Sequence, residues 1–267
     1  MSALTSTRSS DARLELAWRL LDEVDSLSLG AFQAGGHRVR RKADGSPVTD
    51  VDVAIQELMS DRIRRVFPDD VVLGEENSSR PRGDDLWIID PLDGTSHFIE
   101  GIPIYAHLLV RLRLGSPVFA IVSAPALGKR WWAYRGVGAF RWDERIRVSD
   151  TREVASALIT YGGLVDYGNY GDAFTALVRS CARSRGFGNF FPHMLVAEGT
   201  YDLASSGGGG GVWDVAPLAL VVTEAGGSIT AFDGGAWDAR RPVLTSNSAL
   251  HDHALAILAT ARPRMKG

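Results

Sequence analysis

The chain has 267 residues and a formal net charge of −3, and 45% of its residues are hydrophobic and 23% charged. These values are ordinary for a globular protein built as one large domain or two smaller ones. They exclude the strongly basic character of nucleic-acid-binding and membrane-surface proteins.

The only cysteine, Cys181, excludes an intramolecular disulfide, and we expect a buried structural thiol on a helix face. Residues 1–10 are polar and lack the apolar core of a signal peptide. No stretch of the sequence reaches the roughly 18 apolar residues that a membrane span needs. The sequence therefore predicts a soluble, cytoplasmic protein with no membrane and no nucleic-acid partner.

The first 150 residues combine two amphipathic helices with several short strands. Apolar residues recur at helical spacing in the helices, and short apolar runs bounded by turn residues indicate the strands. A basic loop, 37–47, separates the helices and places Lys42 where it could meet a phosphate, and a polar loop is expected at 78–85. The predicted elements are helices 11–34 and 50–66 and strands 71–73, 86–89, 106–114, 118–123 and 131–134.

From about Thr151 the sequence changes to alternating strands and helices. Five consecutive glycines, 207–211, form the one low-complexity stretch. The predicted elements are strands 157–161, 228–232 and 243–246 and helices 174–185, 193–198, 213–224 and 251–260. The sequence thus predicts two halves, 1–150 and 151–267, each layered from helices and strands.

The strand at 86–89 runs directly into two acidic residues, Asp90 and Asp93, which lie one short turn apart. Carboxylates suit hard cations, and Mg²⁺ is usually held by one or two carboxylates together with substrate phosphate. Gly94, Thr95 and Ser96 follow, and their backbone N–H groups could face an anion if a helix begins there. The sequence therefore predicts that a metal ion and a phosphate meet at this turn.

Other acidic residues also lie where a helix begins or a strand ends. Each one alone has an ordinary explanation as a helix cap or a surface charge, and Asp50 or Asp52 could cap the second helix. A whole set at element ends is harder to explain in that way and favours a shared site. The five acids are Asp52, Glu75, Asp90, Asp93 and Asp214.

Three motifs resemble the signatures of the inositol monophosphatase superfamily: Gly74-Glu75-Glu76, Asp90-Pro91-Leu92-Asp93-Gly94-Thr95 and Trp213-Asp214-Val215-Ala216. The stretches 122–127, 130–133 and 195–199 are most similar to the histidinol-phosphate phosphatase branch of actinobacterial type. The resemblance covers most of the chain. It implies an α/β fold with α+β layering, the αβαβα sandwich of the inositol monophosphatase and fructose-1,6-bisphosphatase type.

The resemblance also implies an activity, the Mg²⁺-dependent hydrolysis of a small-metabolite phosphate monoester by a metal-activated water. Two or three ions are expected, with Mn²⁺ able to substitute and Li⁺ inhibiting, and a homodimer is expected by analogy. Asp52 and Thr95 would orient and deprotonate the water, and Glu75 counts with them as catalytic. Gly94, Thr95 and Ser96 would bind phosphate. The implied metal ligands are Glu75, Asp90, the Leu92 carbonyl, Asp93 and Asp214.

Two positions depart from the histidinol branch. That branch carries a glutamate seven residues before the last motif aspartate, where this chain has Gly207, and usually an aspartate where this chain has Asn189. Each lost charge-assisted hydrogen bond to a cationic substrate would cost about 1.5–3 kcal/mol. The glycines are expected to leave a wider and more mobile pocket wall. His193, Tyr161 and Tyr201 are candidate replacement contacts, although such residues more often pack in the core.

Three hypotheses for function stay open. The first is hydrolysis of histidinol phosphate, and the second keeps the reaction but changes the substrate to a nucleotide, amino-sugar or secondary-metabolite phosphate. The third is a non-catalytic regulatory or binding protein on the same scaffold. The complete set of acidic motif residues argues against the third hypothesis, whereas Gly207 and Asn189 favour the second over the first.

Overall fold

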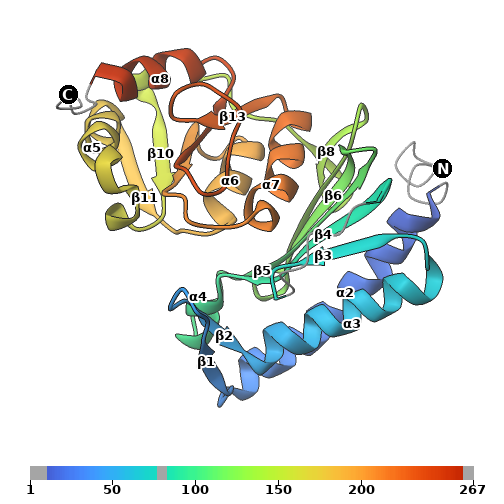
Figure 1. Ribbon diagram of the computed structural model, residues 1–267. Helices are drawn as coiled ribbons and strands as arrows, with labels where there is room; N and C mark the ends of the chain where they lie inside the picture. Colours follow the sequence, from blue (N-terminus) through green and yellow to red (C-terminus); the bar gives the residue numbers. More distant parts are fainter. Residues whose placement is uncertain (1–10, 77–82, 261–267) are drawn as a thin grey trace. The chain divides into compact units, whose positions relative to one another are not determined.

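The computed structural model describes residues 11–76 and 83–260 (Figure 1). The chain divides into two compact units. The first unit runs to Arg135 and includes Phe140–Glu144, and the second contains Gly136–Ala139 and everything from Arg145 onward. The chain therefore passes between the two units three times between Arg135 and Arg145.

A seven-stranded mixed sheet dominates the first unit. Its strands lie in the order β3-β4-β5-β6-β7-β8-β9, and β3 pairs with β4 in parallel, whereas β4, β5, β6 and β7 are antiparallel neighbours. The strands are β3 (Val71–Gly74), β4 (Asp85–Asp93), β5 (Ala106–Arg113), β6 (Ser116–Ala124), β7 (Lys129–Tyr134), β8 (Gly138–Arg141) and β9 (Glu144–Ile146). The predicted hairpin of 106–114 and 118–123 is confirmed as β5 and β6.

Two long helices, α2 (Ala12–Ala34) and α3 (Asp50–Val66), pack against this sheet and against each other (Figure 1). Asp11 caps α2 by accepting hydrogen bonds from the backbone of its first turn, and Gly35, with φ of 66°, ends it. Thr49 caps α3. The short helices α4 (Thr95–Ile99) and η1 (Pro125–Leu127) and the hairpin of β1 (Val39–Arg41) and β2 (Pro47–Thr49) complete the unit.

The second unit is a five-stranded mixed sheet with helices on both faces. The strand order is β11-β10-β12-β14-β13. The strands are β10 (Leu158–Tyr161), β11 (Arg183–Gly186), β12 (Leu203–Ser206), β13 (Gly227–Ala231) and β14 (Val243–Asn247). The helices are η2 (Val154–Ser156), η3 (Leu164–Tyr170), α5 (Gly171–Ser180), α6 (Phe191–Ala197), α7 (Val212–Glu224) and α8 (His251–Thr260).

Alternate residues of β14 show how the two faces are covered. Leu244 belongs to the apolar cluster that α5 and α8 complete, whereas the neighbouring Thr245 bonds to His193 of α6 on the opposite face. Both faces of the sheet are thus covered at β14, whose five residues are all buried.

The sequence prediction was wrong at the end of α5. A single helix was expected over 174–185, but the helix ends at Ser180, and 183–186 is the edge strand β11, parallel to β10. The polar sequence of β11 carries no apolar alternation, so its pairing could not be read locally. Cys181 therefore follows the helix, where it is only half-buried, and burial raises the pKa of its thiol to about 11.

Three further expectations can be compared with the structure. The basic loop 37–47 contains strand β1, and the central strand β12 was not predicted at all. The expectations for residues 1–10 and for most of the loop 78–85 lie outside the described residues. Among the described helices, none has the length and apolar character needed to cross a membrane.

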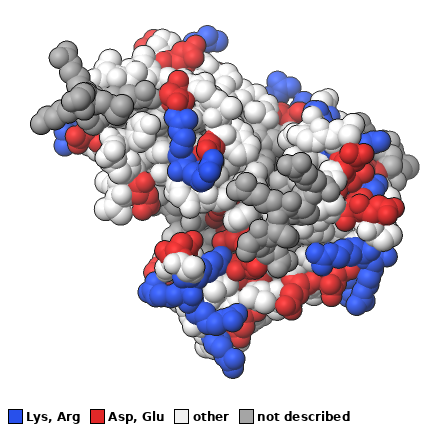
Figure 2. All heavy atoms as spheres, in the orientation of Figure 1, with Lys and Arg blue, Asp and Glu red and all other residues white. Residues whose placement is uncertain are grey.

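Charged residues are mixed on the surface. On the face shown in Figure 2, basic and acidic side chains lie interspersed, as the small net charge of −3 leads one to expect. This distribution gives no single-sign field of the kind that nucleic-acid-binding faces present on that side of the molecule.

Candidate metal and phosphate site

Two of the predicted acids meet because β3 and β4 are parallel. Gly74 pairs with Ile89, and the Glu75 N–H donates to the Ile89 carbonyl over 3.1 Å. The carboxyl ends of parallel strands lie at the same edge of a sheet, so Glu75 and Asp90 come side by side although 15 positions separate them in the chain.

A bulge in β4 brings the next acid into the same place. β4 pairs Asp90 with Leu108 and Asp93 with Ala106 of β5, and the register shifts in between. The two intervening residues of β4 thus lie opposite a single residue of β5. A carboxylate oxygen of Asp90 and one of Asp93 lie within 4.8 Å of each other, and both side chains are buried, at 1% and 9% exposure.

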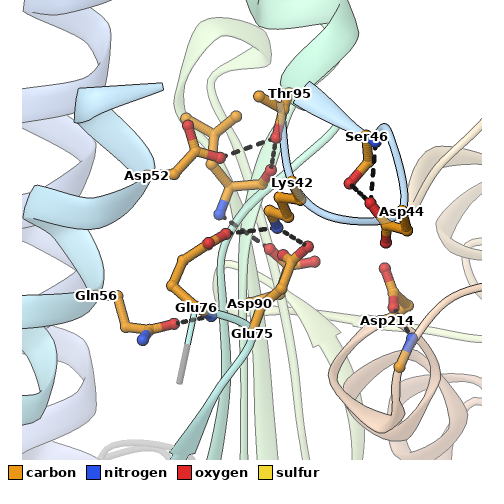
Figure 3. Close-up of polar contacts among 12 residues, drawn as sticks. Lys42, Asp44, Ser46, Asp52, Gln56, Glu75, Glu76, Asp90, Thr95 and Asp214 are labelled. Atoms are coloured by element: carbon orange, nitrogen blue, oxygen red, sulfur yellow. Dashed lines mark hydrogen bonds and ion pairs between the residues drawn. The ribbon is translucent and has the colours of Figure 1, made fainter. Parts of the chain in front are cut away.

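Asp52 and Thr95 lie against each other beside this bulge (Figure 3). The Thr95 hydroxyl is 2.9 Å from Asp52 Oδ1 and 3.0 Å from the Leu92 carbonyl oxygen. Asp52 occupies the third position of α3, where its Oδ2 accepts from the backbone N–H and the hydroxyl of Thr49. One oxygen of Asp52 therefore caps the helix while the other faces Thr95. Burial raises the pKa of Asp52, against the opposing effect of the hydrogen bonds from Thr49 and Thr95.

The chain turns from the bulge into α4 at Gly94. Gly94 has φ of 91° and ψ of 33°, the left-handed region that favours glycine. The first backbone N–H groups of a helix have no acceptor within that helix, and those of Thr95 and Ser96 open α4 directly after the buried carboxylates. A helix therefore does begin at this position, as the sequence prediction required. A phosphate could approach the backbone there.

Lys42 and Gln56 support the acids that follow β3 (Figure 3). Lys42 Nζ lies 2.5 Å from a Glu75 oxygen and 2.6 Å from a Glu76 oxygen. Burial disfavours the charged ammonium, but the hydrogen bonds and charges of the two glutamates outweigh it and raise the pKa of Lys42. Gln56 accepts from the Glu76 N–H over 2.8 Å, and Gly74 leaves room for the Gln56 side chain. No pattern in the sequence singles out Gln56.

Asp214 lies in the second unit, at the third position of α7. Its Oδ2 accepts from the backbone N–H of Gly211 over 2.6 Å. This is half of a capping box, since a glycine has no side chain to complete it. Asp214 is thus fixed at a helix start in the same way as Asp52, which explains why caps and site residues looked alike in the sequence.

Among the residues considered for substrate contact, Asn189 follows Gly188 with a φ of 57°, in the left-handed region. Asparagine and aspartate tolerate that conformation better than most residues, so either could stand there. His193 is only 2% exposed and bonds to Thr245 through Nδ1 over 2.8 Å, which gives it a packing role in the core. Tyr161 and Tyr201 make edge-to-face contacts with Phe174 and Phe187 respectively.

The glycine run is closely packed, which corrects the expectation of a wider pocket wall. A Cβ on Gly207 would lie 2.5 Å from the Cβ of Asp166 and 2.7 Å from its backbone. On Gly208 it would meet the backbone of Arg241 at 2.6 Å. Of the five glycines, only Gly209 has nothing within 4 Å. Asp166 and Arg241 thus approach Gly207 and Gly208 closely, and Gly208 and Gly209 have φ values of 87° and 91°, in the left-handed region that favours glycine.

The residues of the first unit fit a hard divalent cation. Glu75, Asp90 and Asp93 offer carboxylate oxygens and Leu92 a carbonyl, an all-oxygen set of the kind that Mg²⁺ prefers. Two of these carboxylates are almost fully buried. A cation offsets the cost of holding several negative charges away from water, which makes the donor set chemically suited to metal binding.

Comparison with known proteins points to the same family as the sequence motifs. A profile of the inositol monophosphatase family matches residues 11–262. The chain is 37% identical to a histidinol-phosphatase of Streptomyces coelicolor, covering 92% of this chain and 96% of that one. It is 39% identical to a histidinol-phosphatase of Mycobacterium tuberculosis, covering 91% of this chain and 96% of that one.

Among solved structures, an IMPase of Thermotoga maritima superposes with a TM-score of 0.85 at 31% sequence identity, covering 94% of this chain and 98% of that one. The predicted fold, the α/β sandwich of the inositol monophosphatase type, is thereby confirmed. With its motif acids at strand ends and helix starts, and with nearly its whole length matched, the chain belongs to the inositol monophosphatase family and is a phosphoric monoester hydrolase.

Proposed function

We propose that this enzyme hydrolyses the phosphate monoester of a small metabolite in a Mg²⁺-dependent reaction, with histidinol phosphate as the nearest candidate substrate. The observation that carries the proposal is the Thr95 hydroxyl, held between Asp52 and the Leu92 carbonyl at the bulge that carries two buried carboxylates. A polarised hydroxyl beside an oxygen-rich cation site is what activation of a water molecule needs.

Glu75, Asp90, Asp93 and the Leu92 carbonyl would hold the metal, and by its place in the third motif Asp214 would complete the set. When bound, Mg²⁺ neutralises phosphate charge, lowers the pKa of a bound water and stabilises the leaving alkoxide. Two or three ions, substitution by Mn²⁺ and inhibition by Li⁺ are part of the same proposal and follow from the family.

Thr95 and Asp52 accept the proton of the attacking water. Thr95 Oγ1 donates its hydrogen toward Asp52 Oδ1, and its lone pairs accept a hydrogen from the attacking water. The water proton passes to Thr95 as the Thr95 proton passes to Asp52, while the water oxygen bonds to phosphorus and the ester P–O bond breaks. The leaving alkoxide takes a proton from solvent, and Asp52 returns its proton to solvent before the next turnover. A buried carboxylate with a raised pKa is a stronger base than an exposed aspartate, which favours Asp52 as the acceptor.

Gly94, Thr95 and Ser96 would bind the phosphate through backbone N–H groups and hydroxyls at the start of α4. A glycine at the left-handed position lets the backbone come close to the phosphate oxygens. Donors fixed before the reaction stabilise developing charge without the cost of reorganising water.

The proposal is tested by phosphate release from a panel of monoesters, with and without Mg²⁺, for wild type and Asp93→Asn. We expect Mg²⁺-dependent release by the wild type and a loss of about 10³-fold or more in the variant, whose circular dichroism should stay native. Wild-type activity that survives removal of divalent ions, or a fully active Asp93→Asn enzyme, contradicts the metal assignment. No release from any ester would favour a regulatory or binding protein instead.

A second substrate class is favoured by the surroundings of Gly207. The close approach of Asp166 to Gly207 leaves no room there for the glutamate of the histidinol branch. Asn189 likewise offers an amide in place of a carboxylate. An ester of a neutral alcohol, such as a nucleotide, would not need either charge.

Asn189→Asp separates the two substrate classes, because both residues tolerate the left-handed backbone and only the charge changes. If histidinol phosphate is the ancestral substrate, kcat/KM for it should rise about 10-fold, while that for a neutral ester stays level or falls. An equal response of both esters would exclude Asn189 from the substrate site.

A cytoplasmic location and a homodimer complete the proposal: the location follows from the sequence, and the dimer rests on analogy with the family. Sedimentation equilibrium of the purified chain tests the dimer directly, since a monomer at micromolar concentration would exclude it.

A further inference from the structure

The bulge in β4 leaves the backbone of Pro91 and Leu92 outside the regular ladder, opposite His107 of β5. Three polar backbone groups of these residues need partners, because a proline has no N–H. The Leu92 N–H donates to Asp90 Oδ1 over 3.0 Å, and the Pro91 carbonyl bonds to His107 Nδ1 over 2.5 Å. Side chains therefore satisfy these two groups. The Leu92 carbonyl lies 3.0 Å from the Thr95 hydroxyl, whose one hydrogen is shared with Asp52.

The chemistry of these bonds fixes the tautomer of His107. A carbonyl oxygen only accepts, so Nδ1 must carry the hydrogen. Nε2 lies 2.8 Å from the hydroxyl of Ser28 in α2, and in a neutral ring it accepts the Ser28 hydrogen, for which the more distant Asp25 carbonyl, at 3.2 Å, competes. The ring is completely buried, and burial lowers the pKa of His107 despite the nearby charge of Asp25, which supports the neutral form.

His107 is itself held by a row of polar side chains beneath α2. His107 pairs with Ser123 of β6, and Ser123 pairs with Arg130 of β7, so the three residues lie side by side across the sheet. Asp25 of α2 accepts from Ser123 over 2.7 Å and from Arg130 over 2.5 Å. Arg130 also bonds to Asp22 over 2.8 Å. The row ties the inner face of the sheet to α2.

We propose that His107 is a positioning residue, which through its Nδ1–H bond to the Pro91 carbonyl holds the bulge in the shape that presents Asp90, Leu92 and Asp93 to the metal. This inference rests on the proposed metal-dependent reaction. Residues that orient ligands from behind typically change metal affinity or activity 10- to 100-fold when lost.

The geometry distinguishes this role from mere packing. Pro91 lies directly between Asp90 and Leu92, so a shift of its carbonyl turns both neighbouring peptide units. Without the His107 donor, the buried Pro91 carbonyl would have to seek another partner, because leaving it unsatisfied costs about 1–3 kcal/mol. Any such rearrangement moves ligand oxygens whose bonds to the metal tolerate little displacement.

Two amide substitutions that place the nitrogen at different positions test the proposal. In His107→Asn the amide nitrogen replaces Nδ1 and keeps the donor to Pro91, whereas in His107→Gln the amide stands near the place of Nε2 and keeps only the contact with Ser28. We expect Mn²⁺, titrated into the substrate-free protein and followed by electron paramagnetic resonance, to bind about 10- to 100-fold more weakly to the Gln variant and nearly as in wild type to the Asn variant.

Steady-state kinetics should show the same split, with the Gln variant needing more Mg²⁺ for half-maximal rate while its KM for the ester changes little. Long-range proton–nitrogen NMR spectra of the wild type should place the ring hydrogen on Nδ1. Urea unfolding of both variants shows whether weaker metal binding merely follows lower stability.

Equal Mn²⁺ affinities in the two variants would overturn the positioning role, whether both match the wild type or both weaken in step with their stability. A ring hydrogen found on Nε2 would overturn it as well. If the wild type itself neither binds Mn²⁺ nor releases phosphate, the proposed function fails, and the role of His107 fails with it.

Discussion

At the scale of single residues, the same position serves structure and chemistry at once. Asp52 and Asp214 each stand third in a helix, where one carboxylate oxygen accepts a backbone N–H. That bond fixes the side-chain rotamer, and the rotamer in turn fixes the direction in which the second carboxylate oxygen points. For Asp52 the second oxygen meets Thr95. A capping interaction thereby preorganises a site residue before substrate arrives.

Replacing the Thr95 hydroxyl tests the proton path. Thr95→Val keeps the shape but removes the hydroxyl between Asp52 and the Leu92 carbonyl, and we expect kcat to fall about 10²- to 10⁴-fold. Thr95→Ser keeps the hydroxyl and should retain most of the activity. Phosphate release under saturating Mg²⁺ measures both, and equal losses in the two variants would count against Thr95 as the relay.

His193 gives a prediction for stability against pH. Burial lowers the pKa of His193 to about 4 from its ordinary value of 6.5, so the folded protein holds the ring neutral while the unfolded chain protonates it. The resulting stability is fully present above pH 6.5 and is lost as the pH falls toward 4. Between about pH 7.5 and pH 5 the loss is about 2 kcal/mol.

Urea unfolding at these two pH values, compared between wild type and His193→Gln, isolates this contribution. The variant cannot titrate at this position, so its free energy of unfolding should fall less on acidification than that of the wild type. The His107 ring is common to both proteins and cancels in the comparison. Parallel slopes would show that His193 is not held neutral by the fold.

At the scale of elements, strand ends and a bulge build the site. The parallel pairing of β3 with β4 brings Glu75 to Asp90, and the register shift against β5 brings Asp93 to Asp90. In the second unit, close packing explains the glycines at 207 and 208, and left-handed backbone angles favour glycine at 208 and 209. Asp166 of η3 and Arg241 approach the backbone of the glycine run closely.

The close packing of the glycine run predicts a cost for any side chain at Gly207. Gly207→Ala places a methyl group 2.5 Å from Asp166, so the free energy of unfolding should fall by about 1–3 kcal/mol. Gly171→Ala is the matched control, since Gly171 has helical backbone angles and nothing within 4 Å. The control should be neutral or gain about 0.4–1 kcal/mol. Equal free energies of unfolding for the two variants in urea would contradict the close packing at Gly207.

At the scale of the whole molecule, metal binding should appear as stability. A ligand at about 100 times its Kd adds about 2.7 kcal/mol to the free energy of unfolding. For a chain of this size that raises Tm by about 5–10 °C. Differential scanning fluorimetry with and without Mg²⁺ measures the shift. Asp90→Asn should abolish it, whereas Asp61→Asn, at an exposed position of α3, should keep it.

The sequence predicted most of the elements of this molecule because they depend on near neighbours. The helices at 11–34 and 50–66 carry caps and apolar stripes that can be read locally, and the structure has them at nearly the same bounds. The edge strand β11 could not be predicted from such local patterns. Its polar residues gain strand structure only from pairing with β10, which lies more than 20 positions away.

The family motifs, the acids at strand ends and helix starts, and the class of reaction can all be read from the amino-acid sequence. How these residues are held becomes visible only in the fold: the contact of Asp52 with Thr95, the place of His107 behind Pro91, and the packing of Asp166 on Gly207. The difference arises from separation along the chain. Periodicity and motifs record interactions between near neighbours, whereas these contacts join residues 16 to 43 positions apart and exist only once the sheets have formed.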